Sequence, residues 1–250
     1  MNVKQAANVL ELLEFFATHR RPASLAEVSK HFEWPRSSTF NLLGTLASRG
    51  FLYEPKARGG YYPTPLWSNL ARQIESAEPI PEQLHRLLEV LVQETGETAV
   101  LAAASGSYAV FIDCVESPQS IRYAAKPGKL VPLHVTATGR ALLSQMAAVD
   151  RATVLTRATF ERYTTTTLMS VASVEKEIKK SIVRGWFEAN AEFTPDLGGV
   201  ALPLRFPHRH LAVLVAGPMS RVKAYARQLA RTMAKAISQQ LAERTDDKSK

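Results

Sequence analysis

The sequence predicts an α+β protein with a small helical N-terminal domain, a linker helix and a larger C-terminal domain that mixes strands and helices. Three observations support this prediction. Apolar residues recur at helical spacing through residues 3–48. A Pro-Thr-Pro segment at 63–65 marks a boundary, and from Glu97 onward the pattern changes to short apolar runs bounded by turn residues. Strands and helices in no regular alternation are typical of an α+β domain.

The first two helices of the N-terminal domain have clear boundary signals. Residues 3–18 carry apolar side chains at helical spacing, and Arg20-Arg21-Pro22 ends that helix. Ser24 begins the second helix, and Glu27 stands three residues later. This spacing predicts a capping box, in which each side chain satisfies a free backbone N–H of the other residue.

The third helix is expected to begin at Pro35, a residue suited to a first turn, and to end before Gly50. Two short aromatic-rich strands at 51–53 and 61–62 then flank a Lys-Ala-Arg-Gly-Gly turn and predict a β-hairpin. Helix, helix, turn, helix and basic hairpin within about 60 residues is the order of a winged helix-turn-helix.

We therefore expect a winged helix-turn-helix at 1–64, a linker helix at 65–79 and an α+β domain at 80–246. In the last of these, apolar patterning predicts helices and strands in the following segments. The helices are expected at 84–91, 139–146, 171–184 and 221–243, and the strands at 100–102, 110–112, 121–125, 186–193, 199–206 and 211–216.

Composition narrows the class of protein. The chain has 250 residues, 46% of them hydrophobic, which suits one or two globular domains. No apolar run reaches the length of a membrane span, and no secretory leader is evident, so a cytoplasmic protein without a membrane partner is expected. Its single cysteine, Cys114, excludes an internal disulfide and a cysteine-cluster metal site.

The net charge of +8 is concentrated at the two ends of the chain. Residues 1–64 carry a net charge of +3 and residues 219–250 a net charge of +5, whereas the middle is neutral. A basic N-terminal segment favours a polyanionic partner, although a solvated basic surface would give the same composition.

The third helix has the polar, short side chains that a DNA recognition helix needs at its N-terminal end. Arg36 can pair with a phosphate or a guanine, and Asn41 can pair with adenine. Lys56 and Arg58 at the hairpin tip can reach the DNA backbone or the minor groove. The expected DNA-binding residues are Ser24, Arg36, Ser37, Ser38, Thr39, Asn41, Lys56 and Arg58. The alternative is a basic protein-interaction module, or a small-molecule sensor that does not bind DNA.

Several motifs, in order, resemble those of the IclR family of regulators. They are Pro35-Arg36-Ser37-Ser38-Thr39, Leu42-Leu43-Gly44-Thr45-Leu46, Arg49-Gly50-Phe51-Leu52, Lys126-Pro127-Gly128-Lys129, Pro132-Leu133-His134, Thr136 to Leu143 and Gly217-Pro218-Met219-Ser220-Arg221. The resemblance covers nearly the whole chain. Asn41 departs from it, because the family usually has a basic residue there, and this departure bears on the operator sequence.

The resemblance implies a winged helix joined by a helix to a GAF-like effector-binding domain, in dimers that often pair into tetramers. It also implies a double-stranded DNA operator and a small organic acid effector. Leu214 and Ala216 are apolar where hydroxyl residues are common, and Gly199 stands where some members have cysteine, so we expect an effector with an aromatic or apolar part. The expected effector-binding residues are Ala137, Thr138, Gly139, Arg122, Asp113, Ala189, Asn190, Glu192, Phe193, Gly199, Leu214 and Ala216.

An enzyme is not expected. The sequence has no nucleophile elbow, phosphate-binding loop or dinucleotide fingerprint. His208 and His210 flank Arg209 in a turn without a third metal ligand nearby, and Cys114 lies on an apolar strand without a basic partner. We therefore expect no catalytic residue, no metal and no cofactor.

Overall fold

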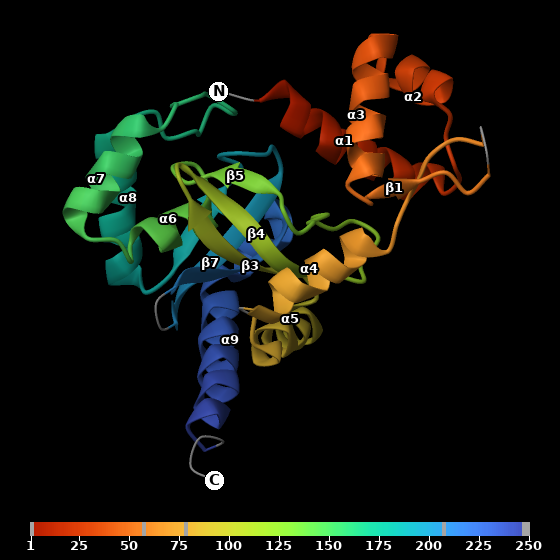
Figure 1. The fold of residues 1–250 in the computed structure, drawn as a ribbon. Coiled ribbons are helices and arrows are strands. Elements are labelled where there is room, and N and C mark those ends of the chain that lie inside the picture. Colours follow the sequence, from red (N-terminus) through yellow and green to blue (C-terminus); the bar gives the residue numbers. More distant parts are fainter. Residues whose placement is uncertain (1–2, 57–58, 78–79, 207–208, 247–250) are drawn as a thin grey trace. The chain divides into compact units, whose positions relative to one another are not determined.

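The structure is a computed structural model that describes residues 3–56, 59–77, 80–206 and 209–246. The chain divides into two compact units, Met1–Pro79 and Ile80–Lys250. Each unit has its own hydrophobic core, and the two are described separately below (Figure 1).

The N-terminal unit contains the predicted helices and hairpin. Its elements are α1 (Lys4–His19), α2 (Leu25–Phe32), α3 (Arg36–Ser48), β1 (Leu52–Tyr53), β2 (Tyr62–Pro63) and α4 (Leu66–Ala77). β1 and β2 pair antiparallel, and the core includes Leu12, Phe16, Val28, Leu43 and Leu46. The predicted winged helix-turn-helix order is therefore confirmed.

The predicted capping box at the start of α2 is present. The Ser24 hydroxyl accepts the backbone N–H of Glu27, and the Glu27 carboxylate accepts the backbone N–H of Ser24. The backbone N–H and the hydroxyl of Ser24 both donate to the Glu27 carboxylate and, with a smaller contribution from Arg21, lower the pKa of Glu27 to about 2. The box fixes the direction in which the chain enters α2.

The C-terminal unit is built on a curled antiparallel sheet with strand order β5-β4-β3-β8-β7-β6 (Figure 1). Its strands are β3 (Thr98–Ser105), β4 (Tyr108–Val115), β5 (Leu130–Pro132), β6 (Phe187–Asn190), β7 (Leu197–Phe206) and β8 (Arg209–Pro218). Its helices are α5 (Glu82–Thr95), α6 (Ala137–Leu143), α7 (Ala148–Arg157), α8 (Val171–Arg184) and α9 (Met219–Asp246). The predicted α+β class is confirmed.

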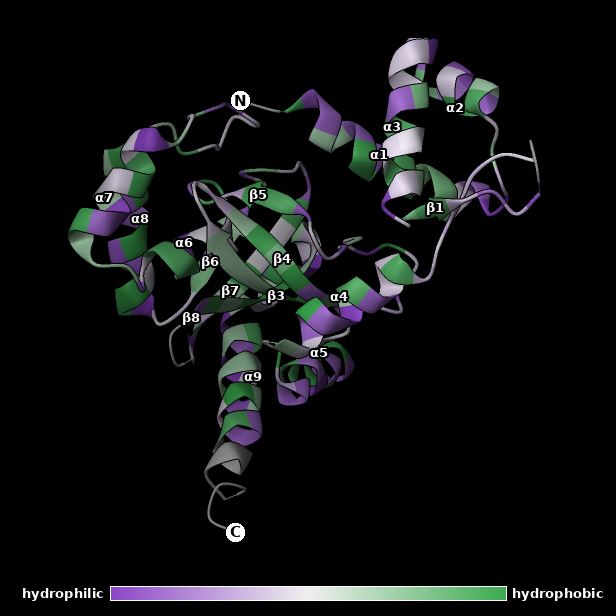
Figure 2. Ribbon diagram, in the orientation of Figure 1, coloured by the Kyte–Doolittle hydropathy of each residue, from purple (hydrophilic) through white to green (hydrophobic). Residues whose placement is uncertain are grey.

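Helices cover both faces of this sheet. Side chains alternate along β8, so that Leu214 and Ala216 face the core formed with α6, α7 and α8, while Val213 and Val215 face α5 and α9. Figure 2 shows mostly apolar strands, and it shows α9 with both apolar and polar residues along its length. Two cores therefore share one sheet.

The strand predicted at 121–125 is wrong. This segment belongs to no strand of the sheet, and its carbonyl groups accept side-chain donors instead of a strand's N–H groups. Thr98 donates to the carbonyl of Tyr123, and Cys114 donates to that of Ala125. The strand next to β4 is instead β5, at Leu130–Pro132.

Sequence patterning also missed α7. Its N-terminal residue Ala147 provides no side-chain cap, and within the helix only Leu155 is buried. Arg151 secures the helix by pairing with Glu175 of α8 at 2.7 Å and by donating to the carbonyl of Met146. Contacts with residues outside the helix thus hold α7 in place, although its own sequence provides no capping side chain and only one buried residue.

Gly139 lies where α6 packs against the preceding segment. A Cβ atom at this position would overlap the backbone of Leu133, including its carbonyl oxygen. Only glycine allows this close approach of backbone to backbone. Gly139 therefore has a structural reason to be glycine.

We expect Gly139→Ala to destabilise the C-terminal unit by about 1–3 kcal/mol or more, because the backbone must move to admit the methyl group. Urea unfolding followed by circular dichroism would measure it. Gly44→Ala is a control of opposite sign, because nothing lies within 4 Å of a Cβ there and alanine stabilises a helix interior. Equal stability of Gly139→Ala and the unsubstituted protein would contradict the packing argument.

Candidate functional site

The exposed face of α3 carries four of the eight residues expected to meet DNA. Pro35 precedes the helix, and the inner face of α3 buries Thr39, Leu43 and Leu46. The side chains on the remaining surface include those of Arg36, Ser37, Ser38 and Asn41, all of them exposed. Ser38 and Asn41 also line a groove between α3 and α1. A cation, two hydroxyls and an amide thus project from the first turns of one helix.

The structure places two of the expected DNA-binding residues in other roles. Thr39 is fully buried, and its hydroxyl donates to the carbonyl of Pro35 at 3.1 Å. It cannot face a duplex, because helical periodicity puts it on the same side as Leu43 and Leu46. The Ser24 hydroxyl is engaged in the capping box of α2.

Phe40 was missed by sequence reasoning, yet 59% of its surface is exposed. An aromatic residue in a helix is normally assigned to the core. The signal that could have identified it is the spacing of Thr39, Leu43 and Leu46, which leaves position 40 outside the buried face. Phe40 places a large apolar ring beside the polar residues of α3.

The hairpin is anchored at its base. The backbones of Ala23 and Tyr61 form a β-bridge, and Gly60 packs against Ala23 with a φ of 91°. A side chain at Gly60 would collide with the Ala23 backbone 2.5 Å away. Lys56 is exposed near the tip of the hairpin, and Arg58 lies outside the described residues.

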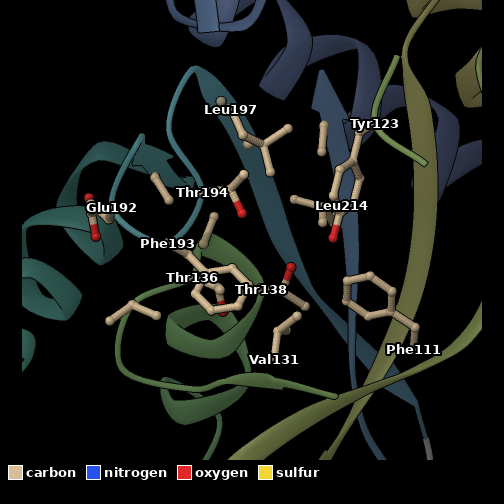
Figure 3. A pocket seen from close by; sticks show the side chains of 16 residues that line it. Phe111, Tyr123, Val131, Thr136, Thr138, Glu192, Phe193, Thr194, Leu197 and Leu214 are labelled. Atoms are coloured by element: carbon tan, nitrogen blue, oxygen red, sulfur yellow. The ribbon is translucent and has the colours of Figure 1, made fainter. Parts of the chain in front are cut away.

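A cavity opens in the C-terminal unit on the sheet face that carries α6 (Figure 3). Its empty volume is about 430 Å³, including the space at the mouth that is open to solvent. The walls are mainly apolar. The lining residues are Phe111, Tyr123, Val131, Val135, Thr136, Ala137, Thr138, Ala189, Glu192, Phe193, Thr194, Leu197, Gly198, Gly199, Leu214 and Ala216.

Eight of the expected effector-binding residues line this cavity. They come from α6, β6 and its following loop, β7 and β8, and they are Ala137, Thr138, Ala189, Glu192, Phe193, Gly199, Leu214 and Ala216. Gly199 pairs with Ala216 across the β7–β8 ladder, so two small residues leave room at this wall. The sheet thus brings together residues that are up to 79 positions apart, from Ala137 to Ala216.

The other four expected residues do not line the cavity. Arg122 is exposed and pairs with Glu116 at 2.8 Å, and Asp113 bonds to His85 of α5 at 2.7 Å. Asn190 lies in the β6 ladder opposite Gly198. Gly139 serves the packing of α6, and its N–H donates to the Thr136 hydroxyl.

Thr138 has the most distinctive polar group in the cavity. The residue is 1% exposed, and its hydroxyl oxygen is buried without a hydrogen-bond partner among the described residues. Figure 3 shows this oxygen within the space bounded by Leu214, Phe193 and Thr194. Because a buried hydroxyl without a partner is costly, this group is available to bind a polar atom in the cavity.

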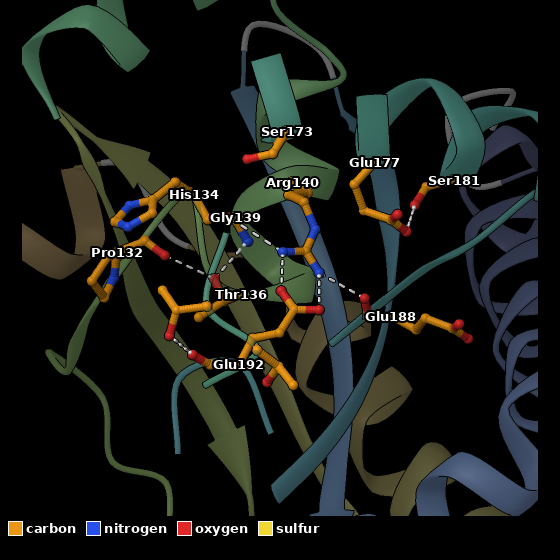
Figure 4. Close-up of polar contacts among 12 residues, drawn as sticks. Pro132, His134, Thr136, Gly139, Arg140, Ser173, Glu177, Ser181, Glu188 and Glu192 are labelled. Carbon is orange, nitrogen blue, oxygen red and sulfur yellow. Dashed lines mark hydrogen bonds and ion pairs between the residues drawn. The ribbon is translucent and has the colours of Figure 1, made fainter. Parts of the chain in front are cut away.

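A buried ion pair supports the cavity from behind (Figure 4). Arg140 of α6 is fully buried and contacts both carboxylate oxygens of Glu192, at 2.6 and 3.3 Å. It also donates to the carbonyls of His134 and Glu188. Burial raises the pKa of Glu192, and Arg140 opposes that rise.

Sequence reasoning missed Arg140, although an arginine within the apolar run of α6 was a signal for a buried pair. It also missed Thr164 and Thr167, whose hydroxyls both donate to the carbonyl of Glu192. These residues hold the loop that follows β6. None of the described lining residues is a lysine, arginine or histidine.

The described residues include no cluster of three or more His, Cys, Asp or Glu that could hold a metal ion. The Cys114 thiol donates to the carbonyl of Ala125, and burial raises its pKa, which disfavours the reactive thiolate. Among the described helices, none is long and apolar enough to cross a membrane.

Two family models match the chain. The model of the IclR helix-turn-helix domain matches residues 5–55, and that of the bacterial transcriptional regulator IclR C-terminal domain matches residues 73–243. The chain is 27% identical to the acetate operon repressor of Salmonella typhimurium and 26% identical to the transcriptional repressor IclR of Escherichia coli. Each alignment spans 224 residues and covers 88% of this chain and 82% of the relative.

Solved structures share the fold. The IclR protein of Thermotoga maritima has a TM-score of 0.73 at 23% identity, over 96% of this chain and 99% of that chain. An IclR homolog from Microbacterium hydrocarbonoxydans, complexed with 4-hydroxybenzoate, has a TM-score of 0.68 at 18% identity, over 96% of this chain and 99% of that chain.

The pair between His85 and Asp113 makes stability depend on pH. The hydrogen bond that the protonated His85 ring donates to the Asp113 carboxylate raises the pKa of His85 above its ordinary value of 6.5. A histidine whose pKa is higher in the folded than in the unfolded state stabilises the fold at pH values below its unfolded-state pKa. That stabilisation is lost as the pH rises through its folded-state pKa. His85→Gln should therefore lower the melting temperature more at about pH 5.5 than at about pH 8.5.

Thermal unfolding of both proteins across that pH range would measure the difference. Arg86→Gln is the matched control, because this neighbouring cation pairs with Glu82 on the same helix and stays charged throughout. A deficit of His85→Gln that is equal at both pH values would contradict the role assigned to Asp113.

Proposed function

Because this chain belongs to the IclR family of bacterial transcriptional regulators, we propose that α3 and the hairpin contact its operator and that the C-terminal cavity binds the effector. The protein is a DNA-binding transcriptional regulator. The proposal assigns residues 1–64 to DNA binding, 65–79 to the linker and 80–246 to effector binding. The observation that carries it is the unpartnered Thr138 hydroxyl in an apolar cavity, in a chain whose helix-turn-helix exposes Arg36 and Asn41.

On α3, the proposed roles follow from side-chain chemistry. Arg36 pairs with a phosphate or with the O6 and N7 atoms of guanine, and Asn41 pairs with the N6 and N7 atoms of adenine. Ser37 and Ser38 bind phosphate oxygens. Lys56 and Arg58 in the hairpin sequence bind the DNA backbone or the minor groove.

Phe40 has a role of its own in this proposal. Exposing an aromatic ring to water is unfavourable, and the methyl group of thymine is an apolar contact in the major groove. Phe40 lies one residue before Asn41 and four after Arg36, so the three side chains project from about one turn of α3. We assign it to a thymine beside the base read by Asn41.

Arg36→Ala should weaken binding to the DNA upstream of the protein's own gene by about 5- to 150-fold, the equivalent of about 1–3 kcal/mol. Phe40→Ala should lower affinity and also reduce the preference for thymine at one operator position. Gel shifts on the native segment and on thymine-to-uracil substituted segments would measure both. Uracil lacks the methyl group, so Phe40→Ala should respond less to it than the unsubstituted protein does.

Lys176→Ala on α8 is a control that removes an exposed charge from the C-terminal unit. If Arg36→Ala binds the operator as tightly as this control, the assignment of α3 to the DNA fails. If Phe40→Ala and the unsubstituted protein lose equal affinity on uracil DNA, only the thymine contact fails.

The effector proposed for the cavity is a small organic acid with an aromatic part. Its ring lies against side chains such as Phe111, Phe193 and Leu214, and a polar end reaches the Thr138 hydroxyl. Because the described lining has no cation and Glu192 is already paired with Arg140, hydroxyl groups receive the polar end. The related fold complexed with 4-hydroxybenzoate supports an acid of this class.

Self-association is part of the proposal, as a homodimer or a pair of dimers. Leu66, Leu70 and Ile74 recur at four-residue spacing on α4, and none of them is buried within the chain. Ile74 is 74% exposed. A stripe of this kind supports pairing of linker helices, through which an effector changes the spacing of two α3 helices by its differential affinity for two arrangements.

Thr138→Val should weaken binding of 4-hydroxybenzoate or benzoate by about 10- to 150-fold, because the methyl group that replaces the hydroxyl cannot bond to the acid. Isothermal titration calorimetry would measure the dissociation constants. Thr153→Val is the control, because its hydroxyl lies on the exposed side of α7 and bonds to Val149. Tight binding of small polar acids such as glyoxylate, with none of aromatic acids, would refute the proposed class.

A further inference from the structure

The outer face of α9 carries a row of cations that neither DNA reading by α3 nor effector binding explains. Lys223, Arg227, Arg231 and Lys235 recur at intervals of four residues, and all four are exposed. No aspartate or glutamate occurs between Met219 and Ala242. In the described part of the chain, none of the four forms an ion pair.

Helix geometry makes these residues one surface, which we call the α9 stripe. The inner face of α9 is set by the buried residues Val222, Leu229, Met233 and Ala236. At 100° per residue, the four cations fall on the opposite side of the helix. The stripe is about 18 Å long, with about 6 Å between successive cations along the axis.

Small side chains leave the stripe open. Ala224, Ala234 and Ser238 are exposed between or beside the cations, so the ammonium and guanidinium groups are not shielded. In Figure 2, α9 shows polar bands between apolar ones along its length. The exposed lysines of α8 contrast with this, because Glu175 and Glu177 lie among them.

Like charges four residues apart destabilise an isolated helix, so the arrangement calls for an anionic partner. A second copy of the chain does not fit, because a twofold contact through the stripe would place cations against cations. Duplex DNA does fit, because each strand presents a phosphate every 3.4 Å or so along the axis in an unbroken line. DNA is also the polyanion that this regulator binds.

We propose that the α9 stripe is a second DNA-binding surface, which contacts phosphates outside the segment read by α3 without regard to base sequence. The proposal rests on DNA binding through α3. In this proposal the excess positive charge of the C-terminal end raises the affinity of the regulator for DNA and does not contribute to its sequence specificity.

The test uses the full-length protein and one quadruple variant, Lys223→Gln with Arg227→Gln, Arg231→Gln and Lys235→Gln. The matched control removes the same charge at Lys126, Lys176, Lys179 and Lys180, which are exposed on the same unit. Fluorescence anisotropy would measure affinity for duplexes of about 60 base pairs, one from upstream of the gene and one of random sequence, over a salt series.

The α9 variant should lose about 10-fold or more in affinity at about 50 mM salt on both duplexes, and its salt slope should fall by up to about 3.6, or about 0.9 per phosphate contact. The ratio of affinities for the two duplexes should not change. The affinity of the matched control, with its four substituted lysines, should stay within about twofold of that of the unsubstituted protein.

Unchanged affinity and slope in the α9 variant, or equal losses in the control, would overturn the proposal. In the first case an acidic protein becomes the remaining partner for the stripe. The double variant Lys223→Gln with Arg227→Gln should lose about half of the slope change, which guards against misfolding of the quadruple variant. Asn41→Ala separates this result from the proposed role of α3, because loss of the contact to adenine should change the ratio of affinities for the two duplexes.

Discussion

The geometry of the cavity depends on the buried guanidinium of Arg140. One side chain ties together the segment before α6, through the carbonyl of His134, the strand β6, through that of Glu188, and the following loop, through the carboxylate of Glu192. Removing either charge would leave the other buried without compensation, which is far more costly than the net contribution of the pair. The positions of the lining residues Thr138 and Phe193, which flank this pair in the sequence, therefore follow from an interaction that neither of them makes.

In the N-terminal unit, a small hydrophobic core holds α3 so that its polar side chains face outward. Thr39 shows how this is achieved, because its hydroxyl donates to the carbonyl of Pro35 and the residue is buried on the same helix face as Leu43 and Leu46. Burying a threonine on the inner face leaves Arg36, Phe40 and Asn41 directed outward. The close contact of Gly60 with Ala23 then fixes the hairpin to the start of α2. The N-terminal unit thus positions its outward-facing groups through short-range contacts, whereas the C-terminal unit relies on the long-range pair of Arg140 with Glu192.

Sequence patterns predicted the helices of the N-terminal unit, because local signals such as the Ser24 cap and Gly50 set their boundaries, and apolar alternation predicted most of the sheet. They failed where distant side chains decide the structure. Carbonyls of residues 121–125 are satisfied by Arg221, Thr98 and Cys114, and α7 is held by Arg151 across to Glu175. The same limit applies to the site. Residues around Thr138 and Gly199 could be anticipated, whereas the pairing of Asp113 with His85 depends on a helix 28 positions away.

The two-sided strand β8 has a mechanical consequence. Leu214 and Ala216 form part of the cavity wall, while Val213 and Val215, one peptide unit away on either side of Leu214, pack against α5 and α9. Since the core on the side of α5 and α9 is close-packed, a guest molecule that displaces Leu214 also moves the strand against that core. Because β8 packs against helices on both of its faces, a displacement of Leu214 by a molecule in the cavity is transmitted to α5 and α9 on the other face.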